Sequence, residues 1–186
     1  MIMKKVFIFF IIICISVSVF AQNTTTVAVP KIPVDSVSKK ITYTEVVQQQ
    51  GIKDTLYNRA IHWCNMYFKS PQSVTKVRDK DDGKIEGIYR FKTYNTPLKD
   101  GTQIEAGMVS FTFYIECKEN KYRYKITDLN AKSISYFPLE RWLDKKDPSY
   151  TAEWPNYLIQ VDKYMKDFIA SLKKGMMPTK KVNDTW

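Results

Sequence analysis

Residues Met108 to Cys117 alternate between apolar and polar side chains without interruption, and this pattern constrains the fold more than any other part of the sequence. One side carries Val109, Phe111, Phe113, Ile115 and Cys117, and the other carries Ser110, Thr112, Tyr114 and Glu116. Successive side chains of a strand point to opposite faces, so a period of two indicates a strand with one buried face. The sequence therefore predicts an antiparallel sheet that is covered on one side.

The segments around this strand predict the rest of the sheet and its helices. Asp82-Gly83 and Glu119-Asn120 are typical of tight turns between antiparallel strands. The predicted strands are 41–48, 73–80, 84–94, 108–117 and 121–129. Apolar residues recur every three or four positions over about 54–69 and 155–174, which predicts two amphipathic helices. The expected fold is α+β, a single antiparallel sheet of about five strands with helices on one face, in the order β-α-β-β-β-β-α.

The N-terminus has the residue order of a signal peptide. Two lysines precede an apolar run from Val6 to Phe20, which is too short to span a bilayer comfortably. Val19 and Ala21 supply the small side chains that signal peptidase accepts. We therefore expect cleavage between Ala21 and Gln22 and export to the periplasm or cell envelope, or secretion from the cell. The alternative is an uncleaved N-terminal anchor.

The remaining chain divides by composition. Residues 22–40 are rich in Thr, Val, Pro, Ser and Lys without a sustained period, which predicts a flexible linker after the signal peptide of residues 1–21. The folded domain is expected over residues 41–176, followed by a C-terminal tail over 177–186.

Several stretches of the domain carry a family resemblance. They are Ile41-Thr42-Tyr43-Thr44-Glu45-Val46-Val47, Lys53-Asp54-Thr55-Leu56-Tyr57-Asn58-Arg59-Ala60 with Trp63 and Phe68, Asp82-Gly83-Lys84-Ile85-Glu86-Gly87, and the pair Phe111-Thr112-Phe113 and Tyr122-Arg123-Tyr124. In these residues the chain resembles an uncharacterised domain family of exported Bacteroidetes proteins that is described as having a TATA-binding-protein-like (TBP-like) fold. The resemblance covers residues 41–129 and implies one TBP-like unit, with a helix-grip-like arrangement as the alternative. It implies no functional residue, because the family has no established activity.

The sequence lacks the residue constellations of familiar enzymes and metal sites. His62 is the only histidine, and we expect it at the surface of a helix. Asp79, Asp81 and Asp82 lack the ligand spacing of a calcium loop and are better explained as a solvated turn. We therefore expect a protein without catalytic residues, cofactor or metal. An enzyme of unfamiliar type is the alternative.

The two cysteines outside the signal peptide have two interpretations. Cys64 follows the apolar phase of a helix, and Cys117 that of a strand, so both suit burial as free thiols. An oxidising compartment also permits a disulfide between them. We expect free buried thiols, with the disulfide as the alternative.

A basic surface is the main functional feature that the sequence predicts. The formal net charge is +10 and falls to +8 when the two lysines Lys4 and Lys5 leave with the signal peptide. The strand phases place Arg90, Lys92, Tyr114, Arg123 and Lys125 on the sheet face away from the helices. Cationic and aromatic groups together suit an envelope protein, an anionic lipid or a glycan. Nucleic acid is not expected outside the cytoplasm.

Two functions remain open at this point. The first is a noncatalytic binding or adaptor domain of the cell envelope that uses the basic sheet face. Solvation of an ordinary sheet surface explains the same charges without any partner. The second is a carrier of a small apolar ligand between the sheet and the last helix, in a cavity lined by Phe111, Phe113, Tyr124, Met165 and Phe168. Packing in an ordinary core explains the same side chains without a ligand, because a domain of this size needs most of its aromatic residues to form its core.

Overall fold

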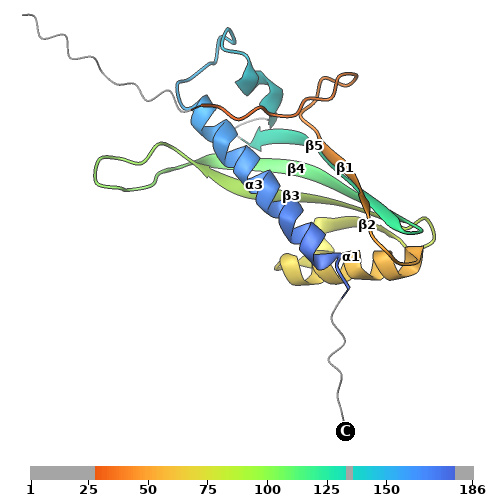
Figure 1. Cartoon of the computed structure of the whole chain (residues 1–186). Helices are drawn as coiled ribbons and strands as arrows, with labels where there is room; N and C mark the ends of the chain where they lie inside the picture. The colour runs from red at the N-terminus through yellow and green to blue at the C-terminus, as the bar shows by residue number, and fades with distance from the viewer. Residues whose placement is uncertain (1–27, 133–135, 179–186) are drawn as a thin grey trace, which may run out of the picture.

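The computed structural model describes residues 28–132 and 136–178, so the predicted signal cleavage site lies outside the described residues. The elements are β1 (Tyr43–Gln48), α1 (Lys53–Tyr67), α2 (Pro71–Val74), β2 (Thr75–Asp79), β3 (Lys84–Tyr94), β4 (Glu105–Lys118), β5 (Lys121–Lys132), β6 (Tyr136–Pro138), the 3-10 helix η1 (Leu139–Leu143) and α3 (Trp154–Gly175). They form one antiparallel sheet with helices across one of its faces (Figure 1). The predicted α+β class is confirmed.

The sheet has six strands in the described residues. Its main path runs β1-β5-β4-β3-β2, and β6 pairs with the end of β5 that β1 does not reach. Long hairpins join β3 to β4 and β4 to β5, which accounts for the clear alternation along β4. The sixth strand was missing from the prediction because its three residues are too few to show a period.

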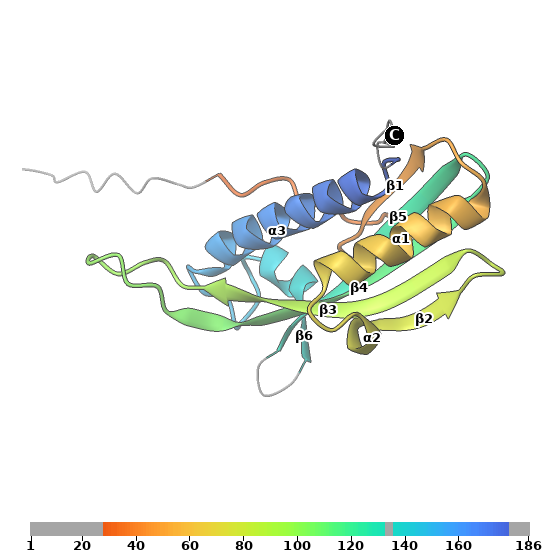
Figure 2. The same cartoon turned by 90° about the horizontal axis from the view of Figure 1, so that it is seen from below.

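Helices α1 and α3 lie side by side above the same sheet face, and none of the helices in the described residues crosses the opposite face (Figure 2). The buried residues of α3 include Leu158, Val161, Met165, Phe168 and Leu172. They recur every three or four positions, so this stripe packs on the sheet while the lysines of α3 remain outside. Within residues 28–132 and 136–178, none of the helices has the length and apolarity needed to cross a membrane.

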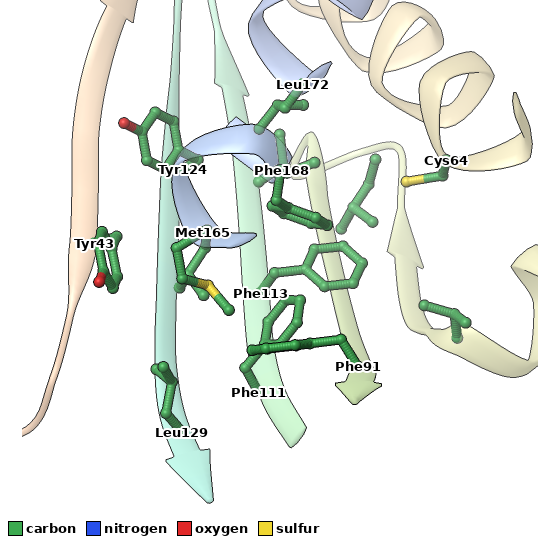
Figure 3. Packing of buried hydrophobic residues seen from close by; sticks show 14 of the residues in the cluster. Tyr43, Cys64, Phe91, Phe111, Phe113, Tyr124, Leu129, Met165, Phe168 and Leu172 are labelled. Atoms are coloured by element: carbon green, nitrogen blue, oxygen red, sulfur yellow. The ribbon is translucent and has the colours of Figure 1, made fainter. Parts of the chain in front are cut away.

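The space between the sheet and α3 is filled by aromatic side chains (Figure 3). The ring centroid of Phe168 lies 5.3 Å from that of Phe111 and 5.8 Å from that of Phe113. Met165 and Tyr124 are also buried. These five residues were predicted to line a carrier cavity. That placement is wrong, because the side chains contact one another and form the core.

Part of the predicted flexible linker is packed on the domain. Ile32 is buried in the core, and Val34 forms a β-bridge with Ile41. Between them the chain turns, and the Ser38 hydroxyl donates a hydrogen bond of 2.7 Å to the Asp35 carboxylate. The linker prediction is therefore wrong for residues 32–40. One isoleucine and a side-chain-bonded turn hold this segment in place, and neither produces a sequence period.

Candidate binding surface on the open sheet face

The structure places all five predicted surface residues on the sheet face away from the helices. Tyr114 of β4 stands between Glu86 of β3 and Lys125 of β5 in the strand register. Arg90 is opposite Ser110, which points to the same sheet face as Tyr114 because the two are an even number of residues apart on β4. We refer to this surface as the open face.

The five residues do not form one continuous patch. Arg90 and Lys92 lie toward one end of β3, while Tyr114, Arg123 and Lys125 lie toward the other end of the sheet. Ser110, the partner of Arg90, is four positions from Tyr114 along β4, which corresponds to about 14 Å along the strand. Arg90 lines a hollow of about 170 Å³ and Arg123 lines another of about 210 Å³. The open face therefore offers two separate shallow contact points.

Carboxylates neutralise part of the predicted basic surface. Lys92 forms an ion pair of 2.6 Å with Glu105, and Arg123 forms one of 2.6 Å with Glu116. Glu105 raises the pKa of Lys92, which remains protonated in the pair. Among the described residues, Arg90 and Lys125 have no carboxylate within ion-pair distance. Of the four predicted cations, these two are therefore the ones most available to a partner.

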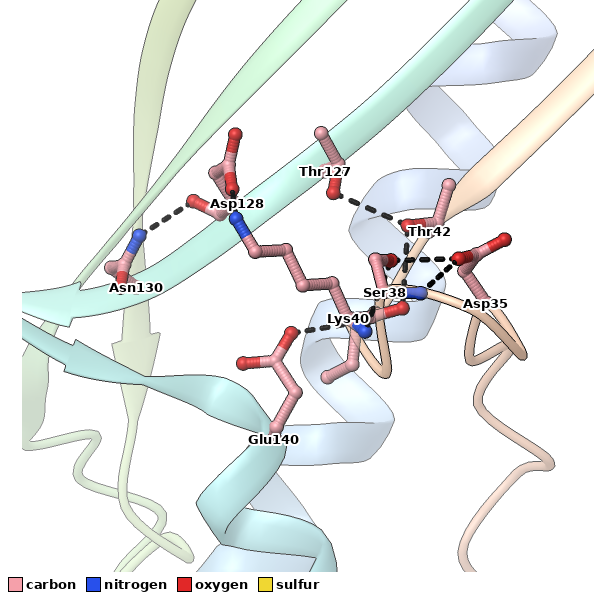
Figure 4. A network of polar contacts seen from close by, with 9 residues as sticks. Asp35, Ser38, Lys40, Thr42, Thr127, Asp128, Asn130 and Glu140 are labelled. Atoms are coloured by element: carbon pink, nitrogen blue, oxygen red, sulfur yellow. Dashed lines mark hydrogen bonds and ion pairs between the residues drawn. The ribbon is translucent and has the colours of Figure 1, made fainter.

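The N-terminal segment adds polar groups to the middle of the open face (Figure 4). Lys40 reaches over β5 and forms an ion pair of 2.5 Å with Asp128. Beside it the hydroxyls of Thr42 and Thr127 share a hydrogen bond of 3.2 Å. Asp128 has a φ of +54° at the point where the β4–β5 register shifts. This bulge aims the carboxylate at Lys40 and could not be read from strand alternation.

Three exposed aliphatic residues of the open face were also absent from the predicted surface. Val46, Val77 and Ile88 are 52, 41 and 48% exposed. Val46 is opposite Arg123, and Val77 is opposite Glu86, so they share the face with the charged residues. The alternation of side chains within residues 43–48 could have placed Val46 on this face. The surface is therefore a mixture of aliphatic groups and charges of both signs.

Groups considered for catalysis or metal binding occupy structural positions. Asp79 accepts a hydrogen bond of 2.9 Å from the Asp82 backbone N–H, which closes the turn between β2 and β3. His62 is exposed on α1. Residues 28–132 and 136–178 contain no cluster of three or more His, Cys, Asp or Glu side chains placed to hold a metal ion.

Cys64 of α1 and Cys117 of β4 are free and buried. Burial raises the pKa of each thiol to about 12, because an apolar surrounding disfavours the thiolate. In protein lacking residues 1–21, we expect both thiols to react with the reagent DTNB at least about a hundredfold more slowly in the native state than in guanidinium chloride. A thiol that reacts at the unfolded rate under native conditions would contradict this burial.

An open antiparallel sheet with its helices on one face is the architecture of the TBP-like α+β class. Residues 43–132 match the model of a family described as "Domain of unknown function (DUF4468) with TBP-like fold". The resemblance expected from the sequence over residues 41–129 is confirmed, because it is this family's model that residues 43–132 match.

Solved structures show the same fold at low sequence identity. A DUF4468 family protein from Bacteroides ovatus is 12% identical with a TM-score of 0.61, and the match covers 86% of this chain and 98% of that protein. A TBP-like protein from Parabacteroides distasonis is 15% identical with a TM-score of 0.55, covering 78% of this chain and 96% of the other. No curated protein matches the chain.

Proposed function

We propose that the protein is an exported, noncatalytic binding domain of the cell envelope that holds an acidic protein partner on its open face. The observation that carries the proposal is that, in residues 28–132 and 136–178, Arg90 and Lys125 have no ion-pair partner and lie on a sheet face that no helix covers. Export is supported by the residue order that ends at Ala21.

The mixture of side chains favours a protein over an anionic lipid or a glycan. Val46 and Ile88 offer aliphatic contacts, which a partner side chain can cover. Glu86 is opposite Tyr114, and Glu116 lies between Lys84 and Arg123 in the strand register, so carboxylates on the same face would repel a uniformly anionic lipid surface. An acidic segment with interspersed apolar residues satisfies both the charges and the aliphatic groups.

The test is capture of envelope proteins from the organism's own extract by the immobilised domain at low salt. The double variant R90E/K125E is expected to retain at least about tenfold less of the specific partner, since rim charges mainly control association and its salt dependence. The matched control K163E/K174E makes the same change in net charge on α3, behind the sheet, and is expected to capture as the wild type does.

Two results would refute the proposal. Equal capture by R90E/K125E and by the control would show that the open face is not the contact surface. Binding of the wild type to phosphatidylglycerol vesicles, with no captured protein sensitive to R90E/K125E, would assign the face to lipid instead. Circular dichroism of all variants verifies that they are folded.

A further inference from the structure

A hollow larger than the two on the open face lies at the end of the sheet where α3 begins. Most of the residues that line it are on the helix-covered side of the sheet. Its volume is about 430 Å³, which is within the range of small-molecule sites. It is lined by the ends of β3, β4 and β5 and by β6, η1 and the first turn of α3, through Thr93, Ala106, Gly107, Met108, Ala131, Lys132, Phe137, Trp142, Trp154 and Tyr157.

Small residues form one side of this hollow. Ala106, Gly107 and Ala131 present little or no side chain. A Cβ atom added at Gly107 would meet no atom nearer than the Lys132 carbonyl oxygen, at 3.7 Å. The protein's own side chains therefore leave the space above these residues open.

Aromatic rings form the other side and hold one another in place. The ring centroid of Trp142 lies 5.3 Å from that of Tyr157 and 6.4 Å from that of Trp154. Phe137 packs edge-on against Trp154 at 5.8 Å, and the Arg141 guanidinium lies 4.1 Å above the Phe137 ring. Rings fixed in this way lose little conformational freedom when a ligand binds.

The indole N–H groups of this cluster are available as donors. The indole of Trp63 donates to Ser171, at 3.1 Å, but those of Trp142 and Trp154 have no acceptor among the described residues, although the two side chains are only 7 and 5% exposed. Every fully buried side-chain nitrogen and oxygen in that part of the chain is paired. Each of these two N–H groups therefore reaches solvent. We infer that both indole N–H groups reach solvent inside the hollow that the two side chains line, because a nearly buried Trp N–H normally has a partner.

We propose that this hollow binds a single sugar ring, either as a free monosaccharide or as one unit of a glycan. A pyranose presents an apolar C–H face to the aromatic rings and hydroxyl oxygens to the indole N–H groups. Its own hydroxyls can donate to the carbonyl oxygens at the strand ends. A purely apolar ligand would leave the indole donors without acceptors, and a cationic ligand would be repelled by Arg141 beside Phe137.

The test is titration of the folded domain with glucose, galactose, N-acetylglucosamine and glucuronic acid. Binding is measured by isothermal titration calorimetry and by the change in tryptophan fluorescence. We expect at least one of these sugars to bind with a Kd below about 10 mM and to change the fluorescence. The variant A106F is expected to weaken that binding at least about tenfold, because Ala106 is exposed at the hollow and the added ring occupies it.

The matched control is A170F, which adds the same ring at an exposed position of α3 outside the hollow. It is expected to bind sugar as the wild type does. The site would be disproved if none of the four sugars and none of their oligomers bound up to about 10 mM, or if A106F and A170F bound equally. Tighter binding of indole or benzoate than of every sugar would overturn the ligand class. Binding of a glycan oligomer but not of its monomer would support the site and identify its source as a polymer.

Discussion

The variant F168A is expected to lower the free energy of unfolding by about 3–5 kcal/mol. Phe168 is 1% exposed and is the aromatic side chain that joins both helices to the sheet. Its ring centroid lies 5.2 Å from Trp63 of α1 and 5.3 Å from Phe111 of β4. Truncation removes these contacts and leaves a cavity that the surrounding rings cannot fill without abandoning their packing.

Guanidinium chloride unfolding, monitored by tryptophan fluorescence, measures this loss. F168L retains part of the apolar volume and is expected to lose less than F168A. The control M66A truncates a large apolar residue of α1 that is 75% exposed, and we expect it to change the free energy of unfolding by no more than about 0.5 kcal/mol. A loss below about 1.5 kcal/mol in F168A would mean that the ring is not the packing centre shown in Figure 3.

Those parts of the fold with a strong local period could be predicted from the sequence. The stripe of α3 and the phase of β4 are examples, and β3 has the expected bounds of Lys84 and Tyr94. The ends of helices and strands could be predicted less well, because hydrogen bonds to neighbouring elements determine where they lie. β4 begins at Glu105 rather than at Met108, since it continues to pair with the end of β3.

Features that depend on contacts distant in sequence could not be predicted. The ion pair between Lys40 and Asp128 joins residues 88 positions apart and requires the bulge at Asp128. The same holds for the neutralisation of Lys92 by Glu105 across the β3–β4 hairpin. A strand period predicts which face a side chain occupies, but it does not predict which charges will meet there.

The aromatic hollow was missed for a related reason. Trp142 falls between the last predicted strand, 121–129, and the second predicted helix, and Trp154 directly precedes that helix. The structure brings both against the strand ends through β6 and η1, two short elements without a period. The concentration of aromatic residues in this connection was the available signal, because loops seldom bury large rings without a structural or functional reason.

The variant G87A, which adds a single methyl group, is expected to lower the free energy of unfolding by about 1–3 kcal/mol. Gly87 is opposite Phe113 in the β3–β4 register, and the Phe113 ring lies over it. A Cβ atom there would stand 2.3 Å from Cζ and 2.5 Å from Cε1 of Phe113, and 3.0 Å from the Val74 carbonyl oxygen. Either the ring must move into a filled core or the strands must separate.

A double-mutant cycle with F113L isolates this contact. F113L removes the ring atoms nearest to the added methyl group, although it is itself destabilising because Phe113 is 1% exposed. If the clash with the ring is the cause, the combined loss in G87A/F113L should be smaller than the sum of the single losses by about 1 kcal/mol or more. Additivity within about 0.5 kcal/mol would instead attribute the loss in G87A to the backbone near Val74. Non-additivity would explain why this interior strand carries a glycine, because the Phe113 ring occupies the space that a side chain at position 87 would fill.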